Sequence, residues 1–443
     1  MNTGFEEAIS RAPLTAFQLA TALICMLLLM CEGVDIQLLG IVAPVVMKDY
    51  GVDKSTFGIA MSAALVGMGI GAWLGGWQGD AIGRRYSLAL AALVFGLATI
   101  AAGASDSVWH MAGWRLLGGL GFGSAFSNAL AMTSEWLPER WRPVAISTLS
   151  VGTPAGGAVA GALVPTLLAD YGWRGTFVAF GGGTLILVVI ILAVLRDSPL
   201  FLLAKGRLEE ANRLAQRIFG REIALRAAAP ESLAARQRSA GVLHRSNLRL
   251  NLGVGLSFAA ATLIAYGVLN WSTTLLTSKG LPLSSASYAI FVAGITSIVG
   301  SVGSGVLVRS FGSRRVLATV SIALFVALLV LAVTLEVAPD APMEGSTGGI
   351  VVLIGLASAA FSCAISTIYV IITLGYPQSC RSAGIGFGIF TGRVGAILAS
   401  GFGGVLLELG HGSTIVFFGV LMASAAIIGG AAFIIDRHVS ATR

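Results

Sequence analysis

Charged residues are scarce in this chain. Asp, Glu, Lys and Arg make up 11% of its 443 residues, whereas 56% of the residues are hydrophobic. A soluble protein of this length could not hide so much apolar surface from water. A membrane-spanning helix needs about 20 apolar residues, so the chain has room for roughly a dozen such helices. The composition excludes a soluble globular protein and predicts an all-α membrane protein.

Residues that carry catalysis or bind metals are also few. The chain has four cysteines and four histidines, and the cysteines show no paired or metal-type spacing. No glycine-rich loop ending in Lys-Ser or Lys-Thr is present, so ATP is not expected to drive the protein. No Ser-His-Asp or metal-ligand cluster stands out in the sequence. We therefore predict that the protein is not an enzyme and has no metal or cofactor.

The apolar segments predict twelve spans. Several of them exceed 20 residues, which implies tilted or kinked helices. Their approximate ranges are 17–44, 56–78, 86–105, 109–135, 144–169, 174–195, 248–276, 286–308, 315–336, 347–376, 383–408 and 413–435.

The net charge of +7 is spread over short loops, which indicates membrane orientation and not a nucleic-acid partner. The loops on one side of the predicted bundle are rich in arginine, and those on the other side mix both signs. The arginine-rich loops carry Arg84, Arg85, Arg140, Arg142, Arg309, Arg314, Arg315, Arg381 and Arg437. The positive-inside rule places this side, and with it both termini, in the cytoplasm.

One long connection divides the spans into two sets of six. We predict an N-terminal bundle over 1–196, a cytoplasmic linker over 197–246 and a C-terminal bundle over 247–443. The linker is rich in arginine, and residues 208–218 have the pattern of an amphipathic surface helix whose basic face contacts anionic lipid. The two halves also have similar sequences in one loop, since residues 80–85 and residues 309–315 follow corresponding spans about 230 residues apart. A duplicated bundle with a central site is a transporter architecture.

Four ionisable residues lie within the apolar spans: Glu32, Asp35, Arg115 and Arg393. A charge at membrane depth costs at least a few kcal/mol, so each should line a cavity or pathway close to a partner. Asp35 and Arg115 lie about 13 Å and 9 Å below the predicted external ends of their spans, so we expect them to share a layer. Glu32 precedes Asp35 by three residues, which places both on one helix face. Two acids and two arginines in this setting predict a carrier that moves an anion together with protons.

Two segments resemble signatures of the major facilitator superfamily. Residues 75–85, which read Gly-Gly-Trp-Gln-Gly-Asp-Ala-Ile-Gly-Arg-Arg, are similar to the loop between its second and third spans. Residues 152–157, Gly-Thr-Pro-Ala-Gly-Gly, resemble its glycine-proline motif in span five. In that family the loop stabilises the outward-facing state through contacts between the halves. The resemblance implies a conformational latch, to which we also assign charges at neighbouring span ends: Asp80, Gly83, Arg84, Arg85, Glu135, Arg142 and Arg381.

A narrower resemblance is to the aromatic acid:proton symporters. Residues 32–35 (Glu-Gly-Val-Asp) match their acid-Gly-X-acid pattern, with Glu32 in place of the usual Asp. Residues 115–121 and 392–398 are also similar to spans four and eleven of that family. The resemblance implies proton-coupled import of a small aromatic carboxylate, similar to hydroxybenzoate, across the bacterial inner membrane.

These patterns lead to residue roles. Arginine has a planar fork that binds a carboxylate bidentately, so we expect Arg393 to anchor the substrate carboxylate. Asp35 and Glu32 are the expected proton-coupling groups, and Arg115 is either the partner of Asp35 or a second anchor. An offset of 236 residues between the halves aligns Trp271 with Asp35, so Trp271 is expected to face the same cavity. The full set of expected substrate contacts besides the two arginines is Trp271, Asn270, Phe126, Asn128, Tyr369 and Phe390.

Alternatives stay open at this point. The charged residues would also suit a proton-driven exporter of drugs or organic acids, or static structural ion pairs. A membrane receptor that binds without transporting is a more remote alternative, because the linker contains no recognisable signalling domain. The expected partners are the substrate and the lipid bilayer, and the expected state is a monomer.

Overall fold

The protein is described by a computed structural model that covers residues 14–138, 141–219, 242–337, 347–376 and 380–441. Within these residues the regular structure is entirely helical. The long helices are α2 (Ala16–Tyr50), α3 (Lys54–Ile82), α4 (Arg84–Gly103), α5 (Val108–Trp136), α6 (Arg142–Val194), α10 (Leu248–Ser278), α11 (Leu283–Phe311), α12 (Ser313–Val337), α13 (Thr347–Gly375), α14 (Arg381–Leu409) and α15 (Ile415–Ile434).

Local sequence explains where the first helices begin and end. Thr15 and Gln18 form a capping box at the start of α2, in which each side chain bonds the other residue's backbone N–H. The helix ends at Gly51, which has φ of 65° and adopts the left-handed conformation that glycine tolerates best. Asp53 then accepts a hydrogen bond from the Thr56 backbone N–H and starts α3. The two helices are thus joined by a short turn.

Helix α6 contains two of the predicted spans. Its backbone breaks at Gly172, where φ is 65° and ψ is 178°, so the chain reverses direction almost without a loop. Ten helices in the described ranges are long and apolar enough to cross a membrane, and one of these contains the break. Helix α5, which carries Arg115, is 29 residues long but is not among those ten. Counting α5 and both parts of α6 gives the twelve predicted spans.

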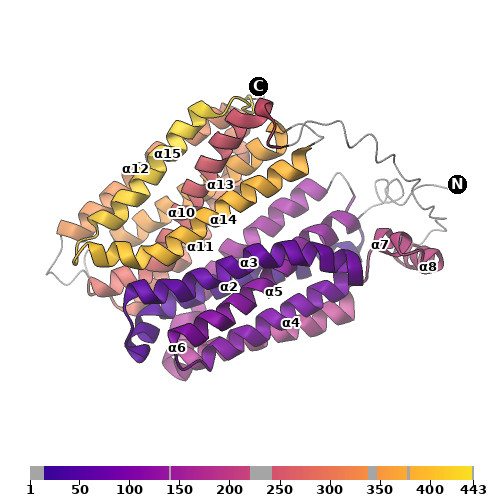
Figure 1. Cartoon of the computed structure of the whole chain (residues 1–443), viewed down its shortest axis with the longest axis horizontal. Coiled ribbons are helices and arrows are strands. Elements are labelled where there is room, and N and C mark those ends of the chain that lie inside the picture. Colours follow the sequence, from indigo (N-terminus) through magenta and orange to yellow (C-terminus); the bar gives the residue numbers. More distant parts are fainter. Residues whose placement is uncertain (1–13, 139–140, 220–241, 338–346, 377–379, 442–443) are drawn as a thin grey trace.

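The helices form two groups that lie side by side (Figure 1). In the first group α3 and α4 pack on α5, and α2 and α4 pack on α6. In the second group α10 packs on α14, α11 on α13, and α12 on both α13 and α15. The groups meet mainly where α3 packs on α14, α6 on α11 and α2 on α10. The exact limits of the predicted domains remain a prediction.

The groups are in close contact at one end of the bundle, which we call the opposite end because it lies away from the arginine-rich loops. A Cβ added at Gly58 of α3 would lie 2.4 Å from the Gly401 carbonyl oxygen of α14. The Glu408 carboxylate of α14 also accepts a hydrogen bond from the Ser55 backbone N–H of α3 at 2.9 Å. Figure 1 shows the groups separating toward the side that carries α7 (Pro199–Ala204) and α8 (Leu208–Phe219). The structure is therefore closed at the opposite end and splayed at the arginine-rich end.

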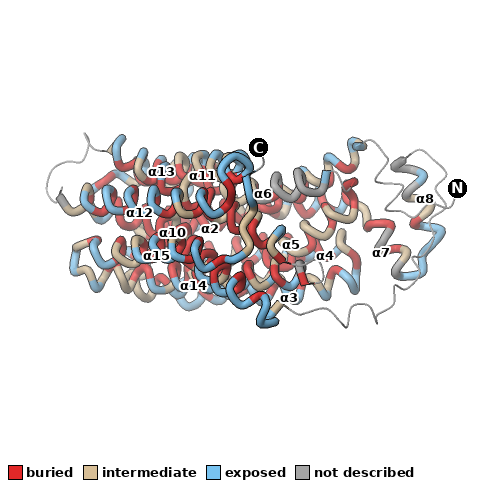
Figure 2. Tube along the Cα trace, turned by 90° about the horizontal axis from the view of Figure 1, so that it is seen from above, coloured by how far each residue is buried: buried red, intermediate tan, exposed pale blue. Residues whose placement is uncertain are grey.

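Apolar side chains cover much of the outer surface. Buried and exposed stretches alternate along the long helices (Figure 2), and many exposed side chains are Leu, Ile, Val or Phe. Trp73 and Trp77 near the end of α3 are 79% and 75% exposed. Such a surface requires lipid contact, and tryptophan at helix ends is typical of the membrane interface. The chain is a multi-pass membrane protein.

Helix α8 covers the residues at which a surface helix of the linker was predicted. Exposed ion pairs link Arg207 to Glu210 at 2.5 Å and Arg213 to Glu209 at 3.0 Å. Residues 220–241 of the linker lie outside the described part of the chain.

Candidate functional site

Both acids of the first span are buried on α2, and their side chains have partners from different helices. Glu32 is 4% and Asp35 is 7% exposed. Asp35 contacts Arg115 of α5 and Thr99 of α4, within the first group. Glu32 contacts Thr153 of α6 and, across to the second group, Arg393 of α14. Neighbouring acids therefore belong to two different ion pairs.

The Asp35–Arg115 pair is almost completely shielded. A guanidinium nitrogen of Arg115 hydrogen-bonds Asp35 Oδ2, and Thr99 Oγ1 donates to Asp35 Oδ1 at 3.4 Å. Removing one partner of a buried ion pair typically costs about 3–5 kcal/mol, because the other charge stays buried and unpaired. The depth estimate from the sequence placed these residues in one layer, and the contact agrees with it. The pair joins α2 to α5, and Thr99 adds α4 to the same cluster.

The Glu32–Arg393 pair joins the two groups of helices. Arg393 Nη2 lies 3.8 Å from Glu32 Oε1, and Thr153 Oγ1 donates to Glu32 Oε2 at 2.8 Å. Glu32 is therefore directed toward α14 and α6, whereas Arg115 pairs with Asp35. Gly33 explains why Thr153 comes so close, because a Cβ at Gly33 would lie 1.9 Å from the Thr153 carbonyl oxygen. The glycine between the two acids thus brings α6 against α2 at the level of Glu32.

Aromatic and polar groups surround Arg393. Its Nη1 donates to the Tyr266 hydroxyl oxygen at 3.3 Å and lies 3.8 Å from the Met68 sulfur. Tyr369 packs edge-on against Phe258, with 5.0 Å between ring centroids, and the Phe258 ring lies against Gly392, the neighbour of Arg393 in the chain. Arg393 is only partly buried, in contrast to Arg115. The arrangement combines an accessible guanidinium, a displaceable carboxylate and aromatic rings.

Two expected substrate contacts are placed elsewhere. Trp271 is fully buried, and its Nε1 donates to the Ala399 carbonyl oxygen at 3.2 Å. The expectation that it faces the same cavity as Asp35 is wrong, because the indole packs into space left by Gly403 and Gly404 of α14. Asn128 donates to the Gly75 carbonyl oxygen at 2.8 Å and belongs to a polar network at the arginine-rich end, and its role in binding substrate stays a prediction.

The other expected contacts differ in their surroundings. Phe126 is half-buried and packs against Phe122 with 6.4 Å between ring centroids. Phe390 lies on the surface of α14 and is 67% exposed. Asn270 is buried, and its amide nitrogen donates to Ser400 Oγ at 2.8 Å. The roles expected for Phe126, Phe390 and Asn270 stay predictions.

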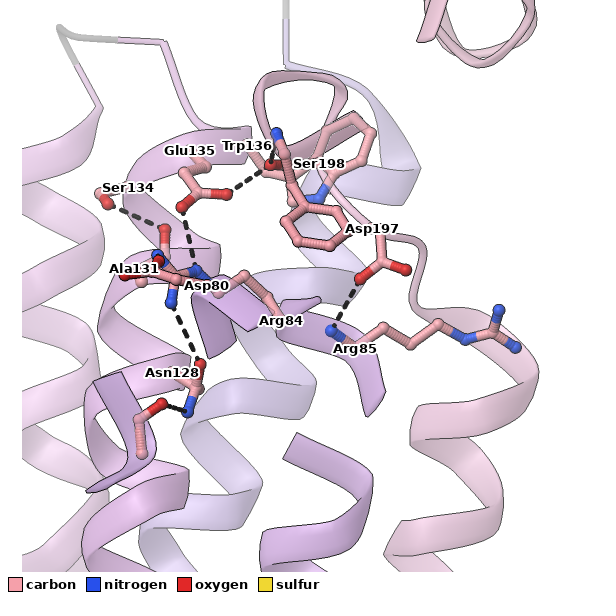
Figure 3. A network of polar contacts seen from close by, with 12 residues as sticks. Asp80, Arg84, Arg85, Asn128, Ala131, Ser134, Glu135, Trp136, Asp197 and Ser198 are labelled. Atoms are coloured by element: carbon pink, nitrogen blue, oxygen red, sulfur yellow. Dashed lines mark hydrogen bonds and ion pairs between the residues drawn. The ribbon is translucent and has the colours of Figure 1, made fainter. Parts of the chain in front are cut away.

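The expected latch residues form a network at the arginine-rich end (Figure 3). Arg84 is its centre, bonded to Asp80 at 2.6 Å, to Glu135 at 3.1 Å and to Asn128 Oδ1 at 3.4 Å. Glu135 also accepts a hydrogen bond from the Ser198 hydroxyl, which ties the network to the start of α7. Apart from Ser198, these residues belong to the first group of helices.

A second contact of the network involves the turn between α3 and α4. The Arg85 backbone N–H donates to Asp197 Oδ1 at 3.1 Å (Figure 3). Gly83 has φ of 98°, and a Cβ there would lie 2.5 Å from the same carboxylate oxygen. Burial raises the pKa of the Asp197 carboxyl above its ordinary value of 3.8, with hydrogen bonding from Arg85 opposing the shift. Arg142 and Arg381, also assigned to the latch, have side chains outside the described part of the structure.

Several contacts were missed by sequence reasoning. Thr153 lies inside the glycine-proline motif, where a hydroxyl between Gly152 and Pro154 was the available signal. Ser55 and Glu408 meet only through the packing of α3 on α14, for which the sequence carries no local signal. Among the described residues, no group of three or more His, Cys, Asp or Glu side chains is arranged to hold a metal ion.

Comparisons with known proteins identify similar chains. The family model of the Major Facilitator Superfamily matches residues 25–341. The 4-hydroxybenzoate transporter PcaK of Acinetobacter baylyi is 27% identical over 95% of this chain and 92% of its own length. The gallate transporter of Pseudomonas putida is 28% identical over 98% of this chain and 95% of its own length. The 3-(3-hydroxy-phenyl)propionate transporter of Escherichia coli is 28% identical over 91% of this chain and 89% of its own length.

The fold also matches solved structures. The xylose transporter XylE from Escherichia coli, in a partially occluded inward open conformation, aligns with a TM-score of 0.75 and 16% sequence identity. The alignment covers 97% of this chain and 100% of that structure, so both helix groups are included. Relatives named as transporters and the helix arrangement agree that the protein transports a solute and is not an enzyme. Because the family model covers more than half of its length, this chain belongs to the major facilitator superfamily.

Proposed function

We propose that the protein imports a small aromatic carboxylate, similar to hydroxybenzoate, together with protons across the bacterial inner membrane. The observation that carries this proposal is the Glu32–Arg393 pair, which joins the two helix groups beside Tyr266 and Tyr369. The relatives named for 4-hydroxybenzoate, gallate and 3-(3-hydroxyphenyl)propionate support the substrate class. In the proposed orientation both termini and the splayed end face the cytoplasm, and the protein acts as a monomer without a bound cofactor.

The central step of the mechanism is the replacement of the Glu32 carboxylate at Arg393 by the carboxylate of the substrate. In the structure the Arg393 guanidinium faces the Glu32 carboxylate. A substrate carboxylate that enters the site competes with Glu32 for the same donors. Protonation removes the charge of Glu32, so Arg393 becomes free to bind the substrate carboxylate bidentately. Release of the proton restores the ion pair and expels the substrate.

Asp35 supplies the second proton-coupling group in this proposal. Its ion pair with Arg115 ties α2 to α5 inside the first group. Protonation of Asp35 weakens that pair and frees Arg115, which changes the contacts of α2 at the level where both groups meet. The two acids thus connect proton binding to the substrate anchor and to the packing of α2. Rocking of the groups about the central site then gives alternating access.

The test uses 4-hydroxybenzoate in de-energised right-side-out membrane vesicles. Wild-type protein should make the external medium more alkaline when substrate is added, because protons enter with it. Asp35→Asn and Glu32→Gln should abolish accumulation while substrate counterflow persists. Arg393→Lys keeps the charge but loses the planar fork, so KM should rise about ten-fold or more if one charge-assisted hydrogen bond is lost.

The outcomes separate import from the alternatives. Normal accumulation by both acid variants would remove the proton-coupling assignment. An unchanged KM in Arg393→Lys would remove the substrate anchor. Expression that increases resistance of cells to a toxic aromatic acid, instead of sensitivity, would indicate export.

A further inference from the structure

The first turn of α3 receives a hydrogen-bond acceptor from the other helix group. The first N–H groups of a helix have no partner within the helix itself. In α3 the Asp53 side chain satisfies the Thr56 N–H at 2.8 Å, as a local cap. The Ser55 N–H instead donates to Glu408 Oε1 of α14, at 2.9 Å. A helix of the first group is therefore capped by a side chain that lies 353 positions away, in the second group.

Glycines bring the Glu408 carboxylate within reach of this N–H. Gly404 precedes Glu408 by about one helical turn, and a Cβ there would clash with the Lys54 carbonyl oxygen. Gly401 lies nearly one turn earlier, and its carbonyl oxygen leaves no room for a Cβ at Gly58 of α3. The backbones of α3 and α14 thus touch over two successive turns, and this close packing sets the position of the carboxylate at the start of α3.

The charge of Glu408 also suits this position. The N-terminus of a helix carries a partial positive charge, and a carboxylate nearby stabilises it. Hydrogen bonds with a charged partner are stronger than neutral ones. Ser55 and Glu408 are both half-buried, so water competes for the bond only in part. The contact therefore favours the arrangement in which the two groups are packed together at this end.

We propose that Glu408 is a removable helix cap that holds the two groups together at the opposite end. The Ser55 N–H and the carboxylate come from different groups, so their bond exists only while α3 and α14 are packed at this level. When the groups separate here, water replaces each partner, and closing restores the bond. The network at the arginine-rich end differs, because the described partners of Arg84 lie within the first group. The role of Glu408 depends neither on which solute is transported nor on proton coupling.

The experiment follows opening at the opposite end through the variant Ala64→Cys. Ala64 of α3 is 5% exposed, although the groups are already splayed at the arginine-rich end, so a thiol there becomes reachable when the opposite end opens. It lies about two and a half helical turns from Ser55, so its labelling does not report a merely local change beside Glu408. The four native cysteines are replaced by alanine, and labelling by a water-soluble maleimide is followed in purified protein in detergent without substrate.

Glu408→Ala removes the cap, so labelling should become about three- to ten-fold faster, the equivalent of one ordinary hydrogen bond. Glu408→Gln keeps an acceptor oxygen but loses the charge, so its labelling rate should lie between those of the parent and of Glu408→Ala. A parent labelling rate in Glu408→Ala, or faster labelling in Glu408→Gln than in Glu408→Ala, would overturn the proposal.

Glu336→Ala is the matched control. Glu336 of α12 also accepts hydrogen bonds at the start of a helix at this end, from the hydroxyls of Ser413 at 3.2 Å and Thr414 at 2.7 Å, just before α15. Both helices belong to the second group, so the loss of this carboxylate leaves the contact between the groups in place. Labelling in Glu336→Ala should equal that of the parent. Equal acceleration in Glu336→Ala and Glu408→Ala would show that the loss of any cap at this end loosens the protein, and it would overturn the role of Glu408.

Discussion

Arg393 and Arg115 differ in ways that fit different tasks. Arg115 is enclosed with a carboxylate of its own helix group, whereas Arg393 is partly accessible and faces a carboxylate of the other group. An enclosed pair resists exchange with a ligand, because a carboxylate from water would have to displace a fully shielded partner. An accessible pair with a separation of 3.8 Å exchanges more readily. These environments support Arg393 as the substrate anchor and Arg115 as the partner of Asp35.

Thr153 is expected to control the proton step without touching the substrate. Thr153→Val removes the hydrogen bond to the Glu32 carboxylate while keeping the shape of the side chain. Hydrogen bonds to charged groups contribute about 1.5–3 kcal/mol, so the maximal uptake rate of 4-hydroxybenzoate should fall about ten-fold or more, with little change in KM. Thr153→Ser keeps the hydroxyl and should restore most of the rate. A wild-type rate in Thr153→Val would contradict this role.

The sequence was sufficient to predict one of the two ion pairs, Asp35 with Arg115. Asp35 and Arg115 could be placed in a common layer, because depth follows from counting residues along straight helices. The partner of Glu32 could not be derived in this way, since Arg393 is on the other half and the contact depends on how α2 and α14 approach. The prediction for Trp271 failed for a related reason. Symmetry between the halves fixes a residue's level, but small neighbours such as Gly403 decide where its side chain fits.

At the scale of the elements, the long helices were predictable and their junctions were not. Apolar length determines a span, so predicted ranges such as 109–135 and 248–276 agree closely with α5 and α10. The near-absence of a loop at Gly172 depends on a single left-handed glycine. The sequence of the latch loop is only partly repeated in the second half, because Ser313 lies between Gly312 and the basic residues. In the structure Ser313 Oγ accepts a hydrogen bond from the Val439 backbone N–H at 2.9 Å, which anchors the C-terminal segment.

Asp197, which accepts a hydrogen bond at the start of α4, gives a prediction about how stability depends on pH. Burial of Asp197 raises its pKa, so its charged form destabilises the fold at neutral pH, and this cost is relieved as pH falls through the raised pKa. Asp197→Asn keeps an oxygen for the Arg85 N–H and removes the buried charge. The variant should melt at a higher temperature than wild type at pH 7, and the difference should disappear under acidic conditions. Thermal unfolding of the purified protein from pH 4 to pH 8 measures this.

The Asp197 prediction has a clear control. Asp80 is largely exposed and lies in the last turn of α3, close in sequence to the turn that Asp197 contacts, so Asp80→Asn removes a charge of the same sign without relieving burial. A gain in stability that is equal in both variants, or that grows at low pH, would contradict the burial argument.

At the scale of the whole molecule, the two groups are joined most closely at one end. If they rock about the central site, transport requires the contact between α3 and α14 to open and close. A Cβ at Gly401 would lie 3.4 Å from the Ser62 Cβ, close to the 3.5–4.5 Å that a disulfide needs. The double variant Ser62→Cys with Gly401→Cys, in a background without native cysteines, should form a disulfide under oxidising conditions. Uptake should then fall to background and recover on reduction.

Each single variant controls for the oxidant and for the added side chain. Uptake by Ser62→Cys or Gly401→Cys alone should not respond to oxidation. Undiminished uptake by the fully cross-linked protein would show that this contact does not open during transport.

The pairing of Glu32 with Arg393 has a consequence for synthesis. The two residues are 361 positions apart, so Glu32 enters the bilayer long before its arginine leaves the ribosome. Asp35 meets Arg115 within the first half, but Glu32 has to wait until the eleventh span is inserted. Thr153, which is made earlier, offers a hydrogen bond during that interval. A chain interrupted before its last spans would carry an uncompensated acid inside the membrane, which gives quality-control proteases a feature by which to recognise incomplete copies.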